Sequence, residues 1–181
     1  MRLLEWTLKA IREERGDFSW MEELRFDWVS AIEETLKRLG EGESIILITD
    51  KKRRWFGDYI LSKINDPSNN RPFLPIYNIN SLICDIEDVV LVEDRVGLIE
   101  DMFDISFSNG YFYWYIGENG DNLSKIAYSK DSSYFWIIDS MQPGVFSLKK
   151  SDELLDIKLL QSYRLFQKSI EAFLFGEIEI G

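Results

Sequence analysis

The stretch SIILIT, residues 44–49, decides the fold class, because it is continuously apolar and rich in β-branched residues. Such a run is typical of a strand that is covered on both faces, as the strands of parallel sheets are. Two further runs, YFYWYIG at 111–117 and YFWIID at 134–139, predict buried strands of the same kind. PFLPIY at 72–77 predicts a shorter strand, and Pro75 moves it towards a sheet edge or a strand end.

Two helices are expected before the first strand. The first is short and ends near Gly16, while the second starts at a capping box of Ser19 and Glu22 and closes at Gly40. The apolar stripe of the first helix consists of Leu4, Leu8 and Ile11. The stripe of the second consists of Leu24, Trp28, Ile32 and Leu36.

Helical patterns also separate the strands in the middle of the chain. Asp50 is expected to cap the helix after SIILIT, and NDPSNNR breaks that helix. Asn80 is expected to cap a short helix, whereas DVVLV fits either a strand or a helix. NLSKIAYSK predicts a short helix, and MQPGVFSLKKSD predicts a loop with room for one short strand. The inner face of the helix after SIILIT consists of Trp55, Phe56, Tyr59, Ile60 and Ile64. A later helical pattern places Val96, Ile99 and Phe103 on one face.

Alternating strands and helices predict parallel strands joined by right-handed crossovers. We therefore expect an α/β protein, a three-layer α/β/α sandwich with a mostly parallel sheet. The 181 residues fit one domain, 1–181. It divides into two N-terminal helices at 3–39, an α/β core at 44–148 and a long C-terminal helix at 151–175 that stops at Gly176.

Composition excludes several classes of function. Acidic residues outnumber basic ones 32 to 21 and the net charge is −11, which argues against direct binding to nucleic acid. The chain has no histidine, which removes Ser-His-Asp catalysis, Cys-His catalysis and the commonest zinc ligand. The single cysteine, Cys84, is expected to be a small buried side chain. We expect no catalytic residue, no metal and no cofactor.

The first residues, MRLLEWTLKAIREERG, are interrupted by charges every few positions, unlike a signal peptide. No apolar run approaches the length of a membrane span. Together with the single cysteine, these features predict a cytoplasmic protein without a membrane partner.

Four consecutive cations, Lys51, Lys52, Arg53 and Arg54, follow the first strand. Ligands of open α/β sheets bind beyond the carboxyl ends of the strands, and phosphate there needs a glycine-rich turn. No glycine precedes Gly57 in this turn, so a backbone cradle for phosphate is not evident. Three interpretations stay open: a solvated basic face, a contact with an acidic partner or a second copy of the chain, and a side-chain clamp for a sugar phosphate.

Acidic residues follow several strands as well. Asp50, Glu118, Asp121 and Asp139 offer ligands for Mg²⁺, but no local motif supports such a site. Asp121 or Asn122 is instead expected to cap the element after GENGDN.

The end of the last helix carries the adjacent residues Phe173, Leu174 and Phe175. Three consecutive helical residues span about 200° of arc, so they cannot all face one core. We expect Leu174 or Phe175 to be partly exposed or covered by another chain. Adjacent exposed apolar groups are typical of protein interfaces.

Several segments resemble the HobA family of bacterial replication-initiation regulators. They are LEWTLKAIREE, FSWMEELRFDW, SIILITD, RPFLPIYNINSL, DMFDISFSNGYFYWYIG and KLLQSYRLFQKSIEAFLFGEIEI. The resemblance implies a flavodoxin-like fold related to sugar-isomerase (SIS) domains, a homotetramer, and binding to the N-terminal region of the initiator DnaA. The resemblance also implies an analogy to DiaA, another SIS-like DnaA-binding protein. DiaA-like proteins carry a Leu-Phe pair near the end of their last helix, and Leu174-Phe175 occupies a matching place.

The sequence and the resemblance together predict a non-catalytic adaptor that binds DnaA and promotes its assembly at the replication origin. The alternative is a sugar-phosphate-binding or isomerase protein of the SIS type. The candidate partner-binding residues are Leu174, Phe175, Lys51, Lys52, Arg53 and Arg54.

Overall fold

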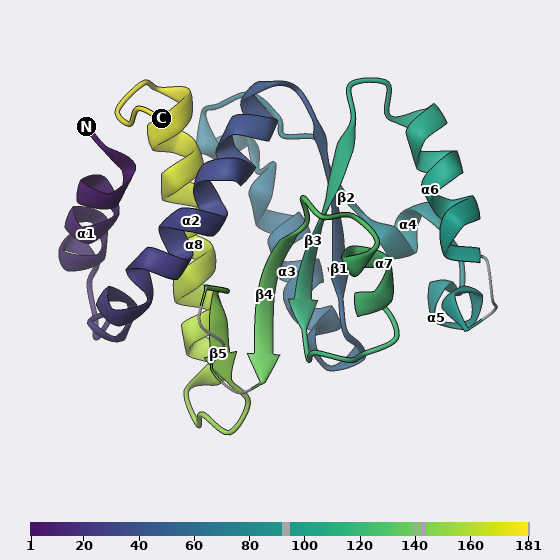
Figure 1. Ribbon diagram of the computed structural model, residues 1–181. Coiled ribbons are helices and arrows are strands. Elements are labelled where there is room, and N and C mark those ends of the chain that lie inside the picture. The colour runs from purple at the N-terminus through teal and green to yellow at the C-terminus, as the bar shows by residue number, and fades with distance from the viewer. Residues whose placement is uncertain (92–94, 140, 142–143, 181) are drawn as a thin grey trace.

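A five-stranded parallel sheet forms the centre of the molecule (Figure 1). The computed structural model describes residues 1–91, 95–139, 141 and 144–180. The strand order is β2-β1-β3-β4-β5. The strands are β1 (Ser44–Thr49), β2 (Ile76–Asn78), β3 (Tyr111–Gly117), β4 (Tyr134–Asp139) and β5 (Ser147–Lys149). The predicted α/β class with a mostly parallel sheet is confirmed.

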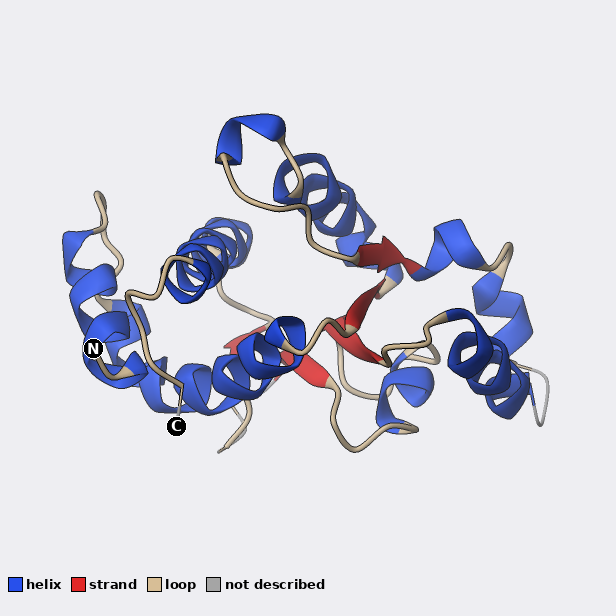
Figure 2. Cartoon of the chain, turned by 90° about the horizontal axis from the view of Figure 1, so that it is seen from above, coloured by secondary structure: helices blue, strands red, loops and turns tan. Residues whose placement is uncertain are grey.

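Helices cover both faces of the sheet, as the view from above shows (Figure 2). One layer holds α1 (Leu3–Glu13), α2 (Trp20–Gly40), α3 (Arg54–Ile64) and α8 (Leu155–Leu174). The other holds α4 (Ile79–Leu82), α5 (Ile86–Val90), α6 (Arg95–Ser106) and α7 (Ser124–Tyr128). Short 3-10 turns lie at η1 (Lys51–Arg53) and η2 (Pro67–Asn69).

Strand β3 is buried along its whole length and contributes to both layers of the core. Successive strand residues point to opposite faces of a sheet, so its side chains alternate between the layers. Phe112, Trp114 and Ile116 join the layer of α2 and α8. Tyr111, Tyr113 and Tyr115 join the layer of α4 to α7. This two-sided burial explains why the strand sequence is continuously apolar and aromatic.

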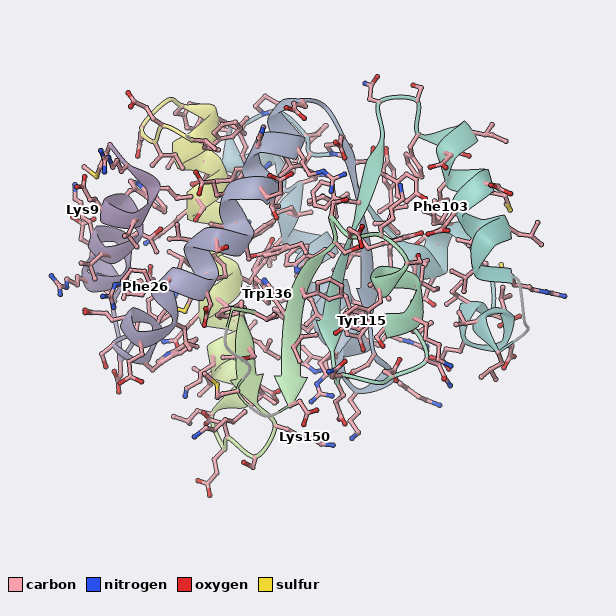
Figure 3. The ribbon with its side chains drawn as sticks, in the orientation of Figure 1. Lys9, Phe26, Phe103, Tyr115, Trp136 and Lys150 are labelled. Carbon is pink, nitrogen blue, oxygen red and sulfur yellow. The ribbon has the colours of Figure 1, made fainter. Side chains whose placement is uncertain are left out.

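Trp136 on β4 is the centre of an aromatic cluster between the sheet and α2 (Figure 3). Its ring centroid lies 5.6 Å from that of Trp28, 5.1 Å from Trp114, 5.4 Å from Phe146 and 6.2 Å from Phe56. The predicted stripe of α2 is buried as expected. Tilted and edge-to-face pairs of this kind fix side-chain orientations beyond what apolar burial alone requires.

The C-terminus folds back on the N-terminus. Helix α8 ends in a left-handed Gly176 with φ +72°, and the Glu177 amide donates to the Ala172 carbonyl at 2.8 Å. This confirms Gly176 as the helix stop. Beyond it, the Glu179 amide donates to the Met1 carbonyl at 3.1 Å, and the Met1 ammonium donates to the Glu177 carbonyl at 3.3 Å. The two ends are therefore hydrogen-bonded side by side.

The predicted capping box at the start of α2 is wrong. Ser19 occupies the N-cap position, but its hydroxyl donates to the Asp17 carboxylate at 2.7 Å and caps no helical amide. Glu22 is bound instead by Arg12 from α1, at 3.0 and 3.1 Å. A contact with a neighbouring helix thus replaces the local reciprocal cap.

Two other helix starts also differ from the prediction. Asn78, and not Asn80, caps α4, because its side chain accepts from the Asn80 amide at 3.0 Å. Helix α8 begins at Leu155 rather than Ser151, since Asp152 forms a separate turn in which its carboxylate accepts from the Leu154 amide at 2.9 Å.

Other elements follow the sequence more closely. Strand β2 is confined to three residues at the sheet edge, directly after Pro75, and 72–75 lie outside it. The DVVLV segment is helical through Val90, and its last valine lies outside the described residues. MQPGVFSLKKSD does contain one short strand, β5.

Three burial predictions are wrong. Leu4, expected on the apolar stripe of α1, is 36% exposed, and Leu3 and Thr7 are buried instead. Trp55 is 42% exposed on α3, although Phe56 and Ile60 on the same helix are buried. Cys84 is exposed in the turn between α4 and α5. All three residues lie near the ends of helices, where apolar periodicity specifies orientation least.

Candidate functional site

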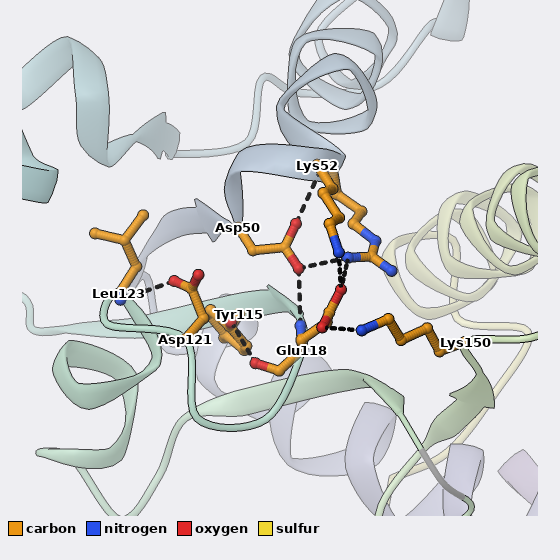
Figure 4. Close-up of polar contacts among 8 residues, drawn as sticks. Asp50, Lys52, Tyr115, Glu118, Asp121, Leu123 and Lys150 are labelled. Carbon is orange, nitrogen blue, oxygen red and sulfur yellow. Dashed lines mark hydrogen bonds and ion pairs between the residues drawn. The ribbon is translucent and has the colours of Figure 1, made fainter.

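A cluster of charged side chains lies at the carboxyl ends of β1 and β3 (Figure 4). We call it the polar centre, and it consists of Asp50, Lys52, Arg53, Glu118 and Lys150. The strand order reverses between β1 and β3, since β2 lies outside β1 and β4 lies outside β3. In open α/β sheets this is the position where ligands normally bind.

Asp50 organises the polar centre from the end of β1. One of its oxygens accepts from the Arg53 amide at 2.9 Å, which confirms the predicted cap. The other accepts from Arg53 Nη1 at 2.7 Å and from the Glu118 amide at 2.8 Å. Asp50 and Arg53 are 3% and 6% exposed, so this is a buried ion pair, and two backbone amides of the same chain also bind its carboxylate.

The Glu118 carboxylate contacts three cations, two from the turn η1 and one from the segment after β5. Its carboxylate lies 2.8 Å from Lys52 Nζ, 3.0 Å from Arg53 Nη1 and 2.5 Å from Lys150 Nζ. These partners, Lys150 first, lower the pKa of Glu118 to about 2, because each stabilises the ionised carboxylate. The same contact raises the pKa of Lys150. The carboxylate thus occupies the position that an anionic ligand would otherwise take.

The approach of Asp50 to β3 depends on Gly117. A Cβ at this position would lie 2.6 Å from Tyr115 Oη and 2.8 Å from Asp50 Oδ2. The Tyr115 hydroxyl in turn donates to the Glu118 carbonyl at 2.8 Å. Only a glycine leaves room for these two polar groups, so the last residue of β3 is fitted to Asp50.

The space next to the polar centre is unsuited to phosphate. A cavity of about 410 Å³ is lined by Asp50, Lys51, Lys52, Glu118 and Asp121, together with Asn119 and Gly120. Three carboxylates face two lysines there, and Lys52 is already paired with Glu118. Asp121 caps the turn into α7, as predicted, by accepting from the Leu123 amide at 2.9 Å. Among the described residues, no group of three or more potential ligands could hold a metal ion.

The four consecutive cations do not form one surface. Arg53 is buried in the polar centre, and Lys52 contacts Glu118. Arg54 is exposed and lies 2.7 Å from Glu87 on α5. Lys51 is exposed and has no ion pair within the part of the chain that the structure describes. The interpretation as a solvated basic face is therefore wrong for Arg53, which the sequence pattern could not distinguish from its neighbours.

The end of α8 presents the two apolar residues expected from the sequence. Leu174 and Phe175 are 39% and 62% exposed. Phe173 turns inward and packs against α2, where its ring would lie 2.8 Å from a Cβ at Gly40. The arc argument is thus confirmed: one of the three residues packs inward and the other two reach the surface.

Phe175 also lines a groove that the sequence did not indicate. The groove, of about 350 Å³, lies between α1 and α8 and is also lined by Trp6, Ala10, Ala172 and Lys168. Trp6 comes from the opposite end of the chain, so only the packing of α1 on α8 reveals that it is near Phe175. An aromatic pair on either side of a partly polar groove is suited to anchor a side chain of another protein.

Comparison with known proteins identifies the family. The family described as "HobA: DNA replication regulator" matches residues 1–180. The chain belongs to the HobA family. The DNA replication regulator protein HobA of Helicobacter pylori is 26% identical over 183 residues, which cover 97% of each chain.

Two solved structures of H. pylori HobA share this fold along nearly the whole chain. HobA in complex with DnaA (domain I-II) has a TM-score of 0.75, 25% identity and 99% coverage of both chains. HobA alone has a TM-score of 0.74, 25% identity, and 99% and 98% coverage. These relatives bear the names of regulators rather than of enzymes.

No described helix of the present chain is long and apolar enough to span a bilayer.

Proposed function

We propose that this HobA-family chain is a non-catalytic adaptor that binds the N-terminal region of DnaA and promotes its assembly at the replication origin. The observation that carries the proposal is the end-to-end likeness to a HobA solved in complex with DnaA (domain I-II). The polar centre supports the non-catalytic part. At the position where related folds bind ligands, its charges are paired within the chain.

The proposed mechanism is that one HobA-family oligomer binds several DnaA molecules at once. In a homo-oligomer, of which a tetramer is the expected form, identical docking surfaces hold several DnaA molecules close together. Tethering raises their effective concentration and favours contacts between them without any new contact to DNA. The net charge of −11 agrees with a role in which DnaA, and not this chain, binds the origin DNA, because an acidic surface repels the phosphate backbone.

For the docking surface we propose Leu174 and Phe175 with the adjoining groove. Exposed aromatic and aliphatic groups at a well-formed groove are the usual anchors of protein interfaces. Lys51 and Arg54 are accessible for secondary contacts at the opposite end of the sheet, and Lys52 is accessible in part. Arg53 is left out of the proposed set because both carboxylates that it contacts belong to this chain.

Calorimetric titration with the N-terminal domains of the cognate DnaA tests this proposal. We expect measurable binding by the wild-type chain and a loss of about tenfold or more in the double variant Leu174→Ala, Phe175→Ala. Phe73→Ala is the matched control, because Phe73 is a more exposed phenylalanine, at 72%, in a different region. Absence of heat with the wild-type chain would refute DnaA binding, and unchanged affinity in the double variant would refute the assigned surface.

The sugar-phosphate alternative receives no support from this geometry. Glu118 fills the space among the cations, and Asp50 and Asp121 face the same cavity. A phosphosugar at about 100 times its Kd would add roughly 2.7 kcal/mol of stability. We expect no shift of the melting temperature in a screen of phosphosugars.

A further inference from the structure

Helix α6 has a buried apolar side and, separate from it, an exposed one. On the inner side Ile99 and Phe103 pack into the core against the sheet (Figure 3). On the outer side Leu98, Met102 and Ile105 are 60%, 58% and 85% exposed. At 3.6 residues per turn these three fall within roughly 60° of arc, and their centre lies roughly 110° around the helix from that of the buried pair. We call them the outer stripe.

An outer stripe of this kind is unusual for a surface helix, whose solvent side is normally polar. In Figures 1 and 2, α6 lies at the margin of the molecule, and none of the other described helices or strands runs along its outer side. Three adjacent apolar side chains with this exposure are typical of surfaces that another polypeptide covers. Leu174 and Phe175 lie at the end of α8, which packs on the other face of the sheet.

The surroundings of the outer stripe are acidic. Residues 84–106 contain eight acidic residues and one basic residue, Arg95, in a chain whose net charge is −11. Asp101 and Asp104 are exposed on α6 itself. Two neighbours from the α7 side moderate this charge: Ser129 donates to Glu100, and Lys130 Nζ lies 3.6 Å from Asp104. Lys130 is largely occupied, because it also lies 3.6 Å from the centre of the Tyr111 ring.

We propose that the outer stripe docks a partner segment that is an amphipathic helix with lysine or arginine beside its apolar side. The apolar stripe supplies area to bury, and the carboxylates select a basic partner and repel an acidic one. A second copy fits less well. Antiparallel two-fold pairing about the middle of the stripe would set Asp101 beside the same carboxylate of the other copy.

This inference does not depend on DnaA binding at Leu174 and Phe175. Its test uses the full chain and a fluorescent synthetic peptide of about 18 residues with leucine and lysine at helical spacing. We expect anisotropy to show binding that weakens as salt is added. A control peptide with serine in place of each leucine keeps the charge, and we expect its affinity to be lower by about tenfold or more.

Variants assign the binding to α6. Leu98→Ser with Ile105→Ser is expected to weaken the leucine–lysine peptide about tenfold or more, and Asp101→Asn is expected to reduce the salt dependence. Phe73→Ser, a distant exposed residue, should leave both properties unchanged. Titration of the same variants with the DnaA domains separates this inference from the proposed function.

Three results would overturn the proposal: no binding by the wild-type chain, equal binding of the two peptides, or unchanged binding in the Leu98→Ser, Ile105→Ser variant. Light scattering provides a fourth test. A smaller assembly in that variant than in the wild-type chain would show that a second copy covers the outer stripe.

Discussion

The polar centre predicts a pH-dependent stability that one substitution should remove. Glu118→Gln keeps the shape of the side chain but deprives Lys52, Arg53 and Lys150 of their shared carboxylate. Arg53 suffers most, because it is buried and would retain only Asp50 as its counter-charge. We therefore expect Glu118→Gln to lower the free energy of unfolding at neutral pH.

The magnitude follows from the pKa of Glu118, which falls from 4.5 to about 2 in the folded chain. Taken at 1.36 kcal/mol per unit, this difference corresponds to roughly 3 kcal/mol. Solvent screening reduces the value, since Glu118 is 24% exposed and Lys52 and Lys150 are 66% and 50% exposed. We expect a loss of about 1 to 1.5 kcal/mol at pH 7.

The sign with pH is fixed by the direction of the shift. A carboxylate whose folded pKa is depressed stabilises the folded state above its unfolded pKa and loses that contribution as it is protonated. The difference between wild type and Glu118→Gln should therefore be full above pH 5 and shrink between about pH 4.5 and pH 2.

Urea denaturation of both proteins at several pH values measures this difference. Glu153→Gln, which changes an exposed carboxylate outside the polar centre, is the matched control and should give no pH-dependent difference. A Glu118→Gln difference that stays constant from pH 7 to pH 3, or that is absent at pH 7, would refute the assigned ion pairs.

Three further substitutions test the packing. Gly117→Ala places a methyl group against Tyr115 Oη and Asp50 and is expected to cost about 2 kcal/mol in urea denaturation. Gly176→Ala puts a side chain at φ +72° and should cost about 1 kcal/mol, with equal stability of both proteins as the contrary result. Trp136→Ala empties the centre of the aromatic cluster, and a loss of about 3 to 5 kcal/mol is expected by thermal unfolding. A loss below about 1 kcal/mol would show that the cluster is not tightly packed.

Elements with a strong repeating pattern could be predicted from the sequence. SIILIT and YFYWYIG form the two central strands because burial on both faces requires continuous apolar sequence. Helical geometry alone predicted that Leu174 or Phe175 is exposed, and both are. These predictions depend on the spacing of residues within one element, which the sequence specifies directly.

Properties that depend on two distant segments could not be predicted in this way. Arg53 is buried because Glu118, 65 positions later, returns to the end of β1. Glu22 binds Arg12 of another helix and so does not form the predicted cap. Trp6 and Phe175 line the same groove only because α1 packs on α8. Local motifs gave no signal for these contacts, because each needs the strand order or the helix packing to be known first.

The hydrogen-bonded ends of the chain make circular permutation feasible. A short linker between residues 179 and 1 would follow an existing path, since the Glu179 amide already reaches the Met1 carbonyl at 3.1 Å. New termini could open at the exposed turn around Asn109, between α6 and β3. In the permuted sequence Phe175 would lie far from both chain ends. Tags or reporters fused to the new termini would therefore be distant from the groove.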